Sequence, residues 1–220
     1  MTDDDQPNDT QPNSDQASND APDDAEPTTL AERRGVETSV YQPAEDSGLL
    51  AEAALDHAQG RTLEVGTGSG WVAERVAVET DCEVVASDVN PHACRQARGR
   101  GLAVVRGNLL EPFRDGTFDT LLFNPPYLPT DPDHEWDDWM EQALSGGESG
   151  RELIEPFLAD ADRVLRSGGR VLLLVSSLTG FEDVLALARG AGFDAETVRE
   201  ESFPFETLSV LKLQRTGAEH

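Results

Sequence analysis

The sequence is poor in lysine, cysteine and long apolar runs, and each shortage excludes a class of protein. Lys212 is the one lysine, and Lys and Arg together number 17 against 43 acidic residues, a formal net charge of −26. Binding to a nucleic-acid backbone or an anionic membrane needs a basic surface, so direct binding to either is disfavoured. An acidic, lysine-poor surface suits concentrated salt, where the Debye length falls to about 3 Å at 1 M. We therefore expect a halophilic source.

The two cysteines and the hydropathy pattern indicate a cytoplasmic protein. Cys82 and Cys94 have no metal-binding spacing, and we expect both to be buried, reduced thiols. No apolar run approaches 18 residues, and the N-terminus is polar and acidic, so neither a transmembrane helix nor a signal peptide is expected. No metal site is expected either.

The first 30 residues differ in composition from the rest of the 220-residue chain. They contain nine acidic residues and no Lys or Arg. Such a segment buries too little apolar surface to offset the entropy of ordering it. We expect a disordered acidic tail over residues 1–30 and one folded domain over residues 31–220.

The folded part alternates strand and helix patterns. A helix after residue 150 is expected to end at Gly168-Gly169, and the last two strands are expected to form an antiparallel hairpin. This order is typical of an α/β fold with a doubly wound, mostly parallel sheet of seven strands. The expected strands are 61–65, 83–87, 102–106, 117–123, 170–175, 193–199 and 206–213.

Three strand ends carry residues suited to a nucleoside ligand. Glu64 to Gly70 reads E-x-G-x-G-x-G between a strand and a helix, and its glycines let the backbone approach a ligand closely. Trp71 stands where the dinucleotide motif G-x-G-x-x-G has its last glycine. Asp88 ends the second strand, where an acid can bind both ribose hydroxyls or cap the helix that starts near Pro91. Asn108, after the third strand, is expected to flank an adenine.

The fourth strand ends in Asn124-Pro125-Pro126-Tyr127, the stretch that we expect to bind substrate. The Asn124 amide and the Pro125 carbonyl can accept N–H groups, and Tyr127 offers a flat face. Together they suit a planar amide or amine. The alternative is an ordinary turn at the end of a strand, where Asn-Pro is common.

Two further stretches are placed near this site. Glu45, Asp46 and Ser47 lie in the first turn of an expected helix, where acids and caps belong. Capping does not explain two adjacent acids or the preceding Tyr41-Gln-Pro. Residues 129–150 contain Trp136 and Trp139 and read as a substrate-covering lid or a small packed cap.

These motifs resemble those of the class I S-adenosylmethionine-dependent methyltransferases. Val40 to Ser47, Leu63 to Gly70, Asn124 to Tyr127 and Gly146-Gly147-x-x-Gly150-Arg-Glu are similar to stretches of the HemK-like release-factor glutamine methyltransferases, in their short archaeal and eukaryotic form. That form lacks the extra N-terminal helical domain of the bacterial members. The resemblance covers roughly residues 38–213.

The resemblance implies a cofactor, a substrate and a partner. The cofactor is S-adenosyl-L-methionine, and the substrate is the glutamine of the Gly-Gly-Gln loop in a peptide chain release factor. A small zinc-binding activator protein is implied as a heterodimer partner, which we place at the edge strand 102–106. Asn108 stands where the family usually has Asp. The implied cofactor-binding residues are Ser47, Glu64, Gly66, Gly68, Asp88, Asn108, Leu109 and Asn124; Asn124, Pro125 and Tyr127 are the implied catalytic residues, which with Tyr41 and Glu45 would bind substrate.

Four other functions remain open at this point. An N6-adenine methyltransferase on RNA or DNA would use the same Asn124 to Tyr127 stretch, and the acidic charge disfavours it. A protein lysine methyltransferase is a related possibility. A nicotinamide-dependent oxidoreductase is disfavoured by the missing dinucleotide motif, and a catalytically silent scaffold subunit by the intact Asn124 to Tyr127.

Overall fold

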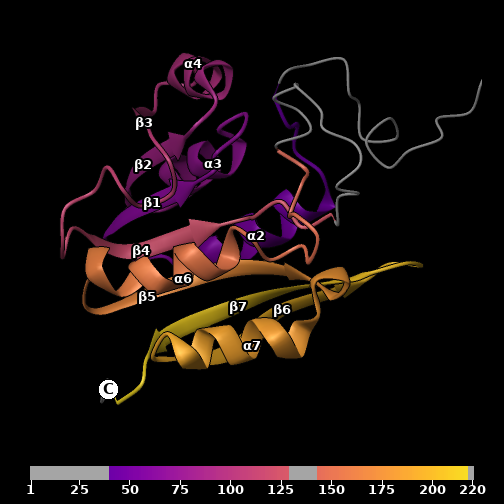
Figure 1. Cartoon of the computed structure of the whole chain (residues 1–220). Helices are drawn as coiled ribbons and strands as arrows, with labels where there is room; N and C mark the ends of the chain where they lie inside the picture. Colours follow the sequence, from indigo (N-terminus) through magenta and orange to yellow (C-terminus); the bar gives the residue numbers. More distant parts are fainter. Residues whose placement is uncertain (1–39, 129–142, 218–220) are drawn as a thin grey trace, which may run out of the picture.

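The computed structural model of the chain describes residues 40–128 and 143–217. The expected acidic tail, with its boundary near residue 30, and the tryptophans Trp136 and Trp139 lie outside the described residues. The described part forms a seven-stranded sheet in the order β3-β2-β1-β4-β5-β7-β6 (Figure 1), which confirms the predicted number of strands and the predicted α/β fold. The strands are β1 (Arg61–Val65), β2 (Glu83–Asp88), β3 (Ala103–Arg106), β4 (Phe118–Phe123), β5 (Leu165–Ser176), β6 (Phe193–Ser202) and β7 (Thr207–Arg215).

Six strands run in one direction, and β7, which lies between β5 and β6, runs antiparallel to both. Sheet order reverses between β1 and β4, which are neighbours although β2 and β3 intervene in the chain. In an open parallel sheet, the crevice for a ligand lies at the carboxyl ends of the strands, at such a switch point. The fold therefore predicts a site at the ends of β1 and β4.

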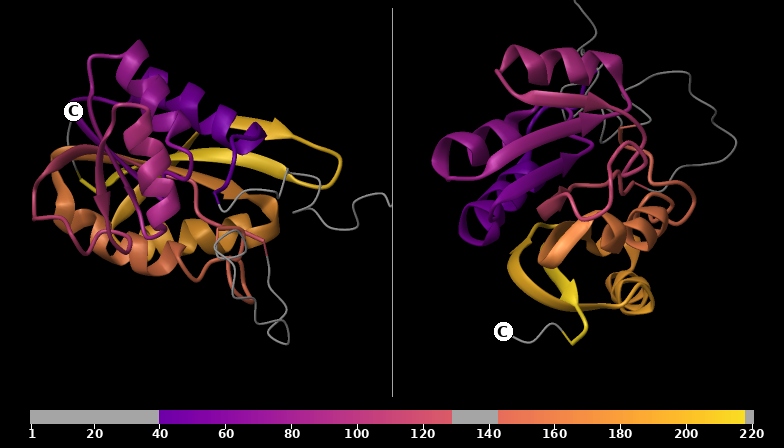
Figure 2. Two further views of the ribbon diagram at one scale, coloured as in Figure 1. Left: turned by 90° about the horizontal axis from the view of Figure 1, so that it is seen from above. Right: turned by 90° about the vertical axis from the view of Figure 1, so that its left-hand side faces the viewer.

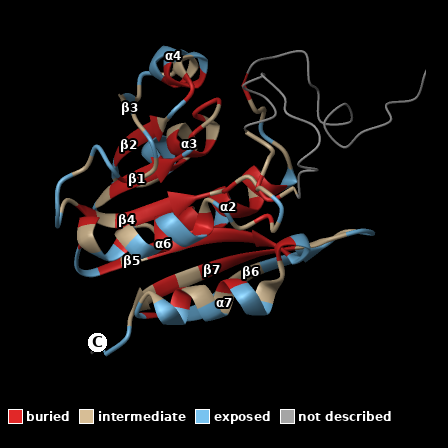
Figure 3. Ribbon diagram, viewed as in Figure 1, coloured by how far each residue is buried: buried red, intermediate tan, exposed pale blue. Residues whose placement is uncertain are grey.

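Helices cover both faces of the sheet (Figures 1 and 2). Successive residues of a strand point to opposite faces, so Leu121 and Phe123 pack in one core and Leu122 in the other. The core of Leu121 faces α6 (Ile154–Val164) and α7 (Phe181–Gly190), and that of Leu122 faces α2 (Glu45–His57) and α3 (Trp71–Glu79). The central strands are buried, and the outward surface of α7 is exposed (Figure 3). The other helices of the described part are α4 (Pro91–Gly99) and the 3₁₀ helix η1 (Ser177–Thr179).

The expected helix end at Gly168-Gly169 is wrong. Helix α6 ends at Val164, and β5 begins at Leu165 and includes both glycines. The register between β4 and β5 shifts at this point, since Phe118 pairs with Leu165 while Thr120 pairs with Arg170. Gly168 has φ 78°, a left-handed conformation that suits glycine, so the pair accommodates an irregularity inside the strand rather than a helix stop.

Two smaller expectations are also corrected. Asn90, and not Asp88, caps α4, because its side chain accepts a hydrogen bond of 2.8 Å from the His92 N–H. Both cysteines are free; Cys94 is buried as expected, whereas Cys82 is only half-buried. Within residues 40–128 and 143–217, no helix has the length and apolar character needed to cross a bilayer.

Candidate active site

A pocket opens at the carboxyl ends of β1, β2 and β4, where the switch in strand order predicts it. All but one of the predicted site residues line this pocket. Glu45 does not, because it lies exposed in the first turn of α2. Its role in substrate binding stays a prediction. The pocket brings together Tyr41, Ser47, Glu64, Gly66, Gly68, Asp88, Asn108, Leu109, Asn124, Pro125 and Tyr127.

The turn after β1 is shaped by its glycines. Gly66, Gly68 and Gly70 all have positive φ, which side chains disfavour. A Cβ on Gly70 would lie 2.8 Å from the Cβ of Ala97, so α3 and α4 pack as closely as they do only because this residue is glycine. The Gly68 N–H donates a hydrogen bond of 2.9 Å to Asp88, which ties the turn to the end of β2. The two strand ends thus form one rigid wall of the pocket.

Glu64 is a buried carboxylate on that wall, with 4% of its surface exposed. It accepts hydrogen bonds from the Thr67 hydroxyl and, at 3.1 Å, from the Ala73 N–H at the start of α3. Burial raises the pKa of Glu64 to about 7, since the hydrogen bonds offset only part of the desolvation and the nearby charge of Asp88 adds to the rise. A cation bound beside Glu64 would favour its ionised form.

Asp88 is held in place by backbone donors from two sides. Its Oδ1 accepts from the Asn90 N–H at 2.8 Å, and its Oδ2 from the Gly68 N–H. Burial raises the pKa of Asp88, and backbone hydrogen bonds from Asn90, Gly68 and Val89 oppose the rise. A carboxylate has about four acceptor positions, so acceptor capacity remains for a ligand on the pocket side. That arrangement suits a diol such as that of a ribose.

The loop after β3 forms the third wall. Asn108 donates from Nδ2 to Glu111 at 2.9 Å, which leaves its Oδ1 as the atom available to accept from an adenine amine. Leu109 has φ 42°, a strained conformation for a residue with a side chain. Such strain persists only where the surroundings hold the backbone in place.

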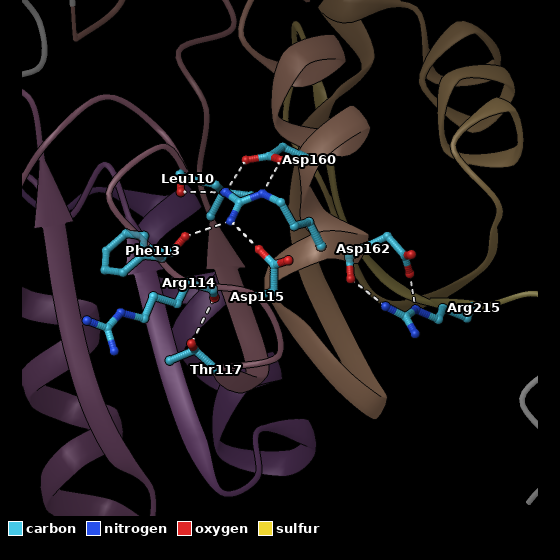
Figure 4. Close-up of polar contacts among 9 residues, drawn as sticks. Leu110, Phe113, Arg114, Asp115, Thr117, Asp160, Asp162 and Arg215 are labelled. Carbon is cyan, nitrogen blue, oxygen red and sulfur yellow. Dashed lines mark hydrogen bonds and ion pairs between the residues drawn. The ribbon is translucent and has the colours of Figure 1, made fainter.

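Arg163 on α6 supplies that hold (Figure 4). Its guanidinium donates to the carbonyls of Leu110 at 3.0 Å and Phe113 at 2.6 Å, and it pairs with Asp115 and Asp160. One side chain thus fastens the loop that carries Asn108 and Leu109 to a core helix. Sequence reasoning missed Arg163, because a single arginine on a helix gives no sign of the carbonyls it will reach.

Asn124 lies directly after β4, beside the glycine turn, because Phe123 pairs with Val65 at the end of β1. Its Oδ1 is buried and has no hydrogen-bond partner within the described part of the chain. Buried polar atoms in native proteins are nearly always paired, so an unpaired acceptor that lines a pocket indicates a donor supplied by a ligand. Tyr127 is 4% exposed and lines the same pocket.

The backbone around Tyr127 is supported by the glycine segment 146–150. The Gly146 N–H donates to Leu128 at 2.9 Å. A Cβ on Gly146 would lie 2.8 Å from the Pro126 carbonyl oxygen, and one on Gly150 would lie 2.8 Å from that of Tyr127. The segment that the sequence matched only by resemblance therefore packs directly on the backbone of the Asn124 to Tyr127 stretch.

Asp46 also lines the pocket, and sequence reasoning did not include it among the site residues. It is 2% exposed and accepts a hydrogen bond of 2.7 Å from the Tyr41 hydroxyl. The signal was present in the sequence: two adjacent acids after Tyr41-Gln-Pro exceed what a helix cap requires. One of them, Glu45, faces solvent, and the other is part of the site.

The chain has relatives among characterised proteins. The model of the family described as "Methyltransferase domain" matches residues 63–125. A Methanocaldococcus jannaschii protein, provisionally named a protein N5-glutamine methyltransferase, is 35% identical over 182 residues, which are 80% of this chain and 92% of the relative. Methyltransferase HEMK2 of Homo sapiens is 31% identical over 199 residues, which are 83% and 93% of the two chains.

Among solved structures, the chain is similar to Mtq2 of E. cuniculi in its complex with Trm112. The TM-score is 0.67 at 28% identity, and the match covers 81% of this chain and all of that one. That complex is described as responsible for methylation of the eRF1 translation termination factor. On this sequence and structural evidence, the chain belongs to the HemK-like glutamine methyltransferases, enzymes of the class I fold that take their methyl group from S-adenosylmethionine.

Proposed function

We propose that this enzyme methylates the side-chain amide nitrogen of the glutamine in the Gly-Gly-Gln loop of a peptide chain release factor. The buried, unpaired Oδ1 of Asn124 carries the proposal. An acceptor left open in a pocket selects a substrate that brings an N–H group. A primary amide brings two. The carbonyl of Pro125, the residue after Asn124, is the second acceptor, and Pro126, which follows it, has no N–H group of its own.

Residues at the ends of β1, β2 and β3 fit S-adenosylmethionine. Buried Glu64 suits the cationic methionine end, the paired carboxylate Asp88 suits the ribose diol, and Asn108 suits the adenine amine. When bound, the cofactor supplies a methyl group on a positively charged sulfur. The three residues come from three strand ends that the sheet places side by side, so together they would hold the cofactor along this edge of the sheet, next to Asn124 at the end of β4.

The chemistry required of this chain is orientation and electrostatics. An amide nitrogen is a weak nucleophile because its lone pair is delocalised. Two hydrogen bonds from its N–H groups to Asn124 and Pro125 would hold it in line with the methyl group and favour positive charge on nitrogen. Held in this way by Asn124 and Pro125, the amide nitrogen would direct its electron pair at the methyl group that S-adenosylmethionine would supply, and the nitrogen would lose one proton in exchange for the methyl group.

Labelled S-adenosylmethionine tests the proposal in concentrated salt. The samples are the native release factor, its variant with Gln→Ala in the Gly-Gly-Gln loop, and total RNA. Label on the native factor and none on the variant is the expected result. Label on RNA would move the assignment to the exocyclic amine of adenine, and label on lysine of either factor would make the enzyme a lysine methyltransferase.

We further propose a heterodimer with a small zinc-binding activator protein that adds to β3. This strand is at one edge of the sheet, with Ala103 and Arg106 exposed and Val104 and Val105 half-buried. An apolar edge strand without a neighbour is a template for pairing with another chain. The similar Mtq2 chain is described in a complex with Trm112, which supports the proposal.

Co-expression with and without the activator tests this partner. Val105→Pro would remove a backbone donor from the edge strand and is expected to weaken the complex in size-exclusion chromatography, whereas Val78→Thr on exposed α3 should not. A single chain that is stable and fully active alone would contradict the heterodimer. We also propose a cytoplasmic, halophilic enzyme with a tail over residues 1–30 and a catalytic domain over residues 31–220, which the acidic composition supports.

A further inference from the structure

The chain contains two tyrosines, and both bring their hydroxyl to the same carboxylate. The Tyr41 hydroxyl donates to Asp46 Oδ2 at 2.7 Å. The Tyr127 hydroxyl, 81 residues away from Asp46 in the chain, lies 3.5 Å from the same oxygen, the outer limit of a hydrogen bond. Catalytic hydrogen bonds are commonly long in a free enzyme and shorten when substrate binds. One carboxylate oxygen thus links the segment before α2 to the end of β4.

The other oxygen of Asp46 is held by its own helix. Oδ1 accepts from the Ser47 N–H at 2.6 Å and from the Ser47 hydroxyl at 3.2 Å. The carboxylate is therefore anchored on one side and directed at the tyrosines on the other. Ser47 is also a pocket residue and a predicted cofactor ligand. Asp46 thus contacts both Ser47, a predicted cofactor ligand, and Tyr127, a predicted substrate ligand.

We propose that Asp46 is a positioning residue, which orients Tyr127 against the substrate amide by accepting its hydroxyl. This inference rests on the proposed function for its kinetic consequence. A buried carboxylate is stable only when donors surround it, and Asp46 is 2% exposed, so the two hydroxyls supply what water would supply elsewhere. In return, the hydrogen bond to Asp46 favours the orientation of the Tyr127 ring that directs its hydroxyl at this carboxylate.

A role as an ordinary acid in the first turn of a helix does not explain the burial. Favourable interaction with the helix dipole needs a negative charge near the N-terminus, and exposed Glu45 provides one at the same turn. The side chain of Asp46 instead points inward, to residues of two other segments. The matched control is Glu52, an exposed acid on the same helix that does not line the pocket.

Tyrosine labelled with ¹³C at Cζ tests the bridge without any substrate. The protein should give two resonances, assigned by Tyr41→Phe and Tyr127→Phe. Asp46→Asn keeps an acceptor for Ser47 and replaces Oδ2 by a donor, so both resonances should shift, whereas Glu52→Gln should move neither. If the Tyr127 resonance is unchanged in Asp46→Asn, the bridge does not exist and the inference is overturned.

Kinetics then test the consequence. With the release factor as substrate, Asp46→Asn and Tyr127→Phe should each lower kcat by about tenfold, the size expected for a charge-assisted hydrogen bond. The double variant should lose no more than the single ones, and the Kd for S-adenosylmethionine should stay within about threefold, since the contacts to Ser47 persist. Losses that multiply would overturn the inference, because they would mean independent roles.

The two readouts separate this inference from the proposed function. A wild-type enzyme that leaves the glutamine unlabelled, while Asp46→Asn still shifts the Tyr127 resonance, would refute the substrate and support the bridge. An enzyme that labels the glutamine, with no shift at Tyr127 in the variant, would support the substrate and refute the bridge.

Discussion

The two sides of the pocket are built differently. On the cofactor side, the carboxylates of Glu64 and Asp88 already accept backbone N–H groups from Ala73, Gly68 and Asn90. On the substrate side, Asn124 carries an acceptor with no partner among residues 40–128 and 143–217. The carboxylates on the first side already have backbone partners, whereas under the proposed function the acceptor of Asn124 gains its partner from a substrate that donates N–H groups. Binding of the cofactor should therefore depend on the fold, and methyl transfer on a few side-chain atoms.

The most direct way to break this difference is Asn124→Ala. Removing the open acceptor should lower kcat by about 100-fold to 1,000-fold, the cost typical of losing one preorganised polar group at a reacting centre. Cofactor affinity should fall much less, because most of its contacts come from the other side. Single-turnover kinetics and calorimetric titration measure the two effects separately. Equal losses in both would mean that the two sides are not distinct.

The packing of the glycine segment 146–150 against the Asn124 to Tyr127 stretch can be disrupted without removing any polar group. Gly150→Ala would place a Cβ 2.8 Å from the Tyr127 carbonyl oxygen, at a residue with φ 70°. We expect a loss of about 1–3 kcal/mol in the free energy of unfolding and at least about tenfold in kcat. Gly190→Ala, where the added Cβ meets nothing within 4 Å, is the control and should leave both unchanged. Thermal unfolding and initial rates measure them.

On the cofactor side, pH sharpens the comparison. The pKa of Glu64 is about 7 in the free protein, and a cationic cofactor favours its ionised form. Affinity for S-adenosylmethionine should rise about tenfold between pH 6 and pH 8, as the ionised fraction grows. Glu64→Gln should bind weakly and without this dependence. Calorimetric titration at constant salt measures this affinity at each pH. An affinity that does not change with pH in the wild type would contradict the assignment of Glu64 to the cofactor.

The same pKa has a consequence for stability with the opposite sign. Between about 4.5 and about 7 the folded protein keeps the Glu64 proton, which the unfolded chain has already lost. The unfolded state then binds fewer protons, so the free energy of unfolding should fall as pH rises through this window. Substitution by Gln should remove that fall. Denaturant unfolding at several pH values, without cofactor, measures it.

The smallest effect is expected for Arg163, which does not line the pocket but holds the backbone of the loop after β3. Arg163→Met would release the carbonyls of Leu110 and Phe113, loosen the loop of Asn108 and raise the KM for S-adenosylmethionine by about fivefold, with kcat little changed. Arg215→Met is the matched control, because Arg215 pairs with Asp162 on the same helix and does not contact the loop (Figure 4). Equal effects of the two variants would show a general loss of stability instead.

The sequence predicted the features that depend on local pattern. Alternating strands and helices predicted a mostly parallel sheet of seven strands. Residues at strand ends, such as Glu64, Asp88 and Asn124, lie in one pocket because parallel strands end at one edge. Gly168-Gly169 was misread because a glycine pair after a helix usually ends it, whereas here β5 starts earlier and contains the pair.

Features that depend on contacts between distant segments were out of reach. Arg163 reaches a loop 50 residues earlier in the chain, and Asp46 meets Tyr127 across 81 residues. Neither separation leaves a periodic signal. Asp46 was nonetheless visible as an unexplained second acid, which shows that residues in excess of a local role are worth testing against the three-dimensional site.

The position of β7 has a consequence for how the molecule folds. Residues 207–215 are synthesised after β6, yet they lie between β5 and β6. Until they are made, β6 has no strand to join and β5 is an open edge. Every described residue that lines the pocket precedes residue 154, so the pocket segments are synthesised before the sheet behind them can close. The hairpin of β6 and β7 must dock as a unit, a long-range pairing of the kind that slows folding.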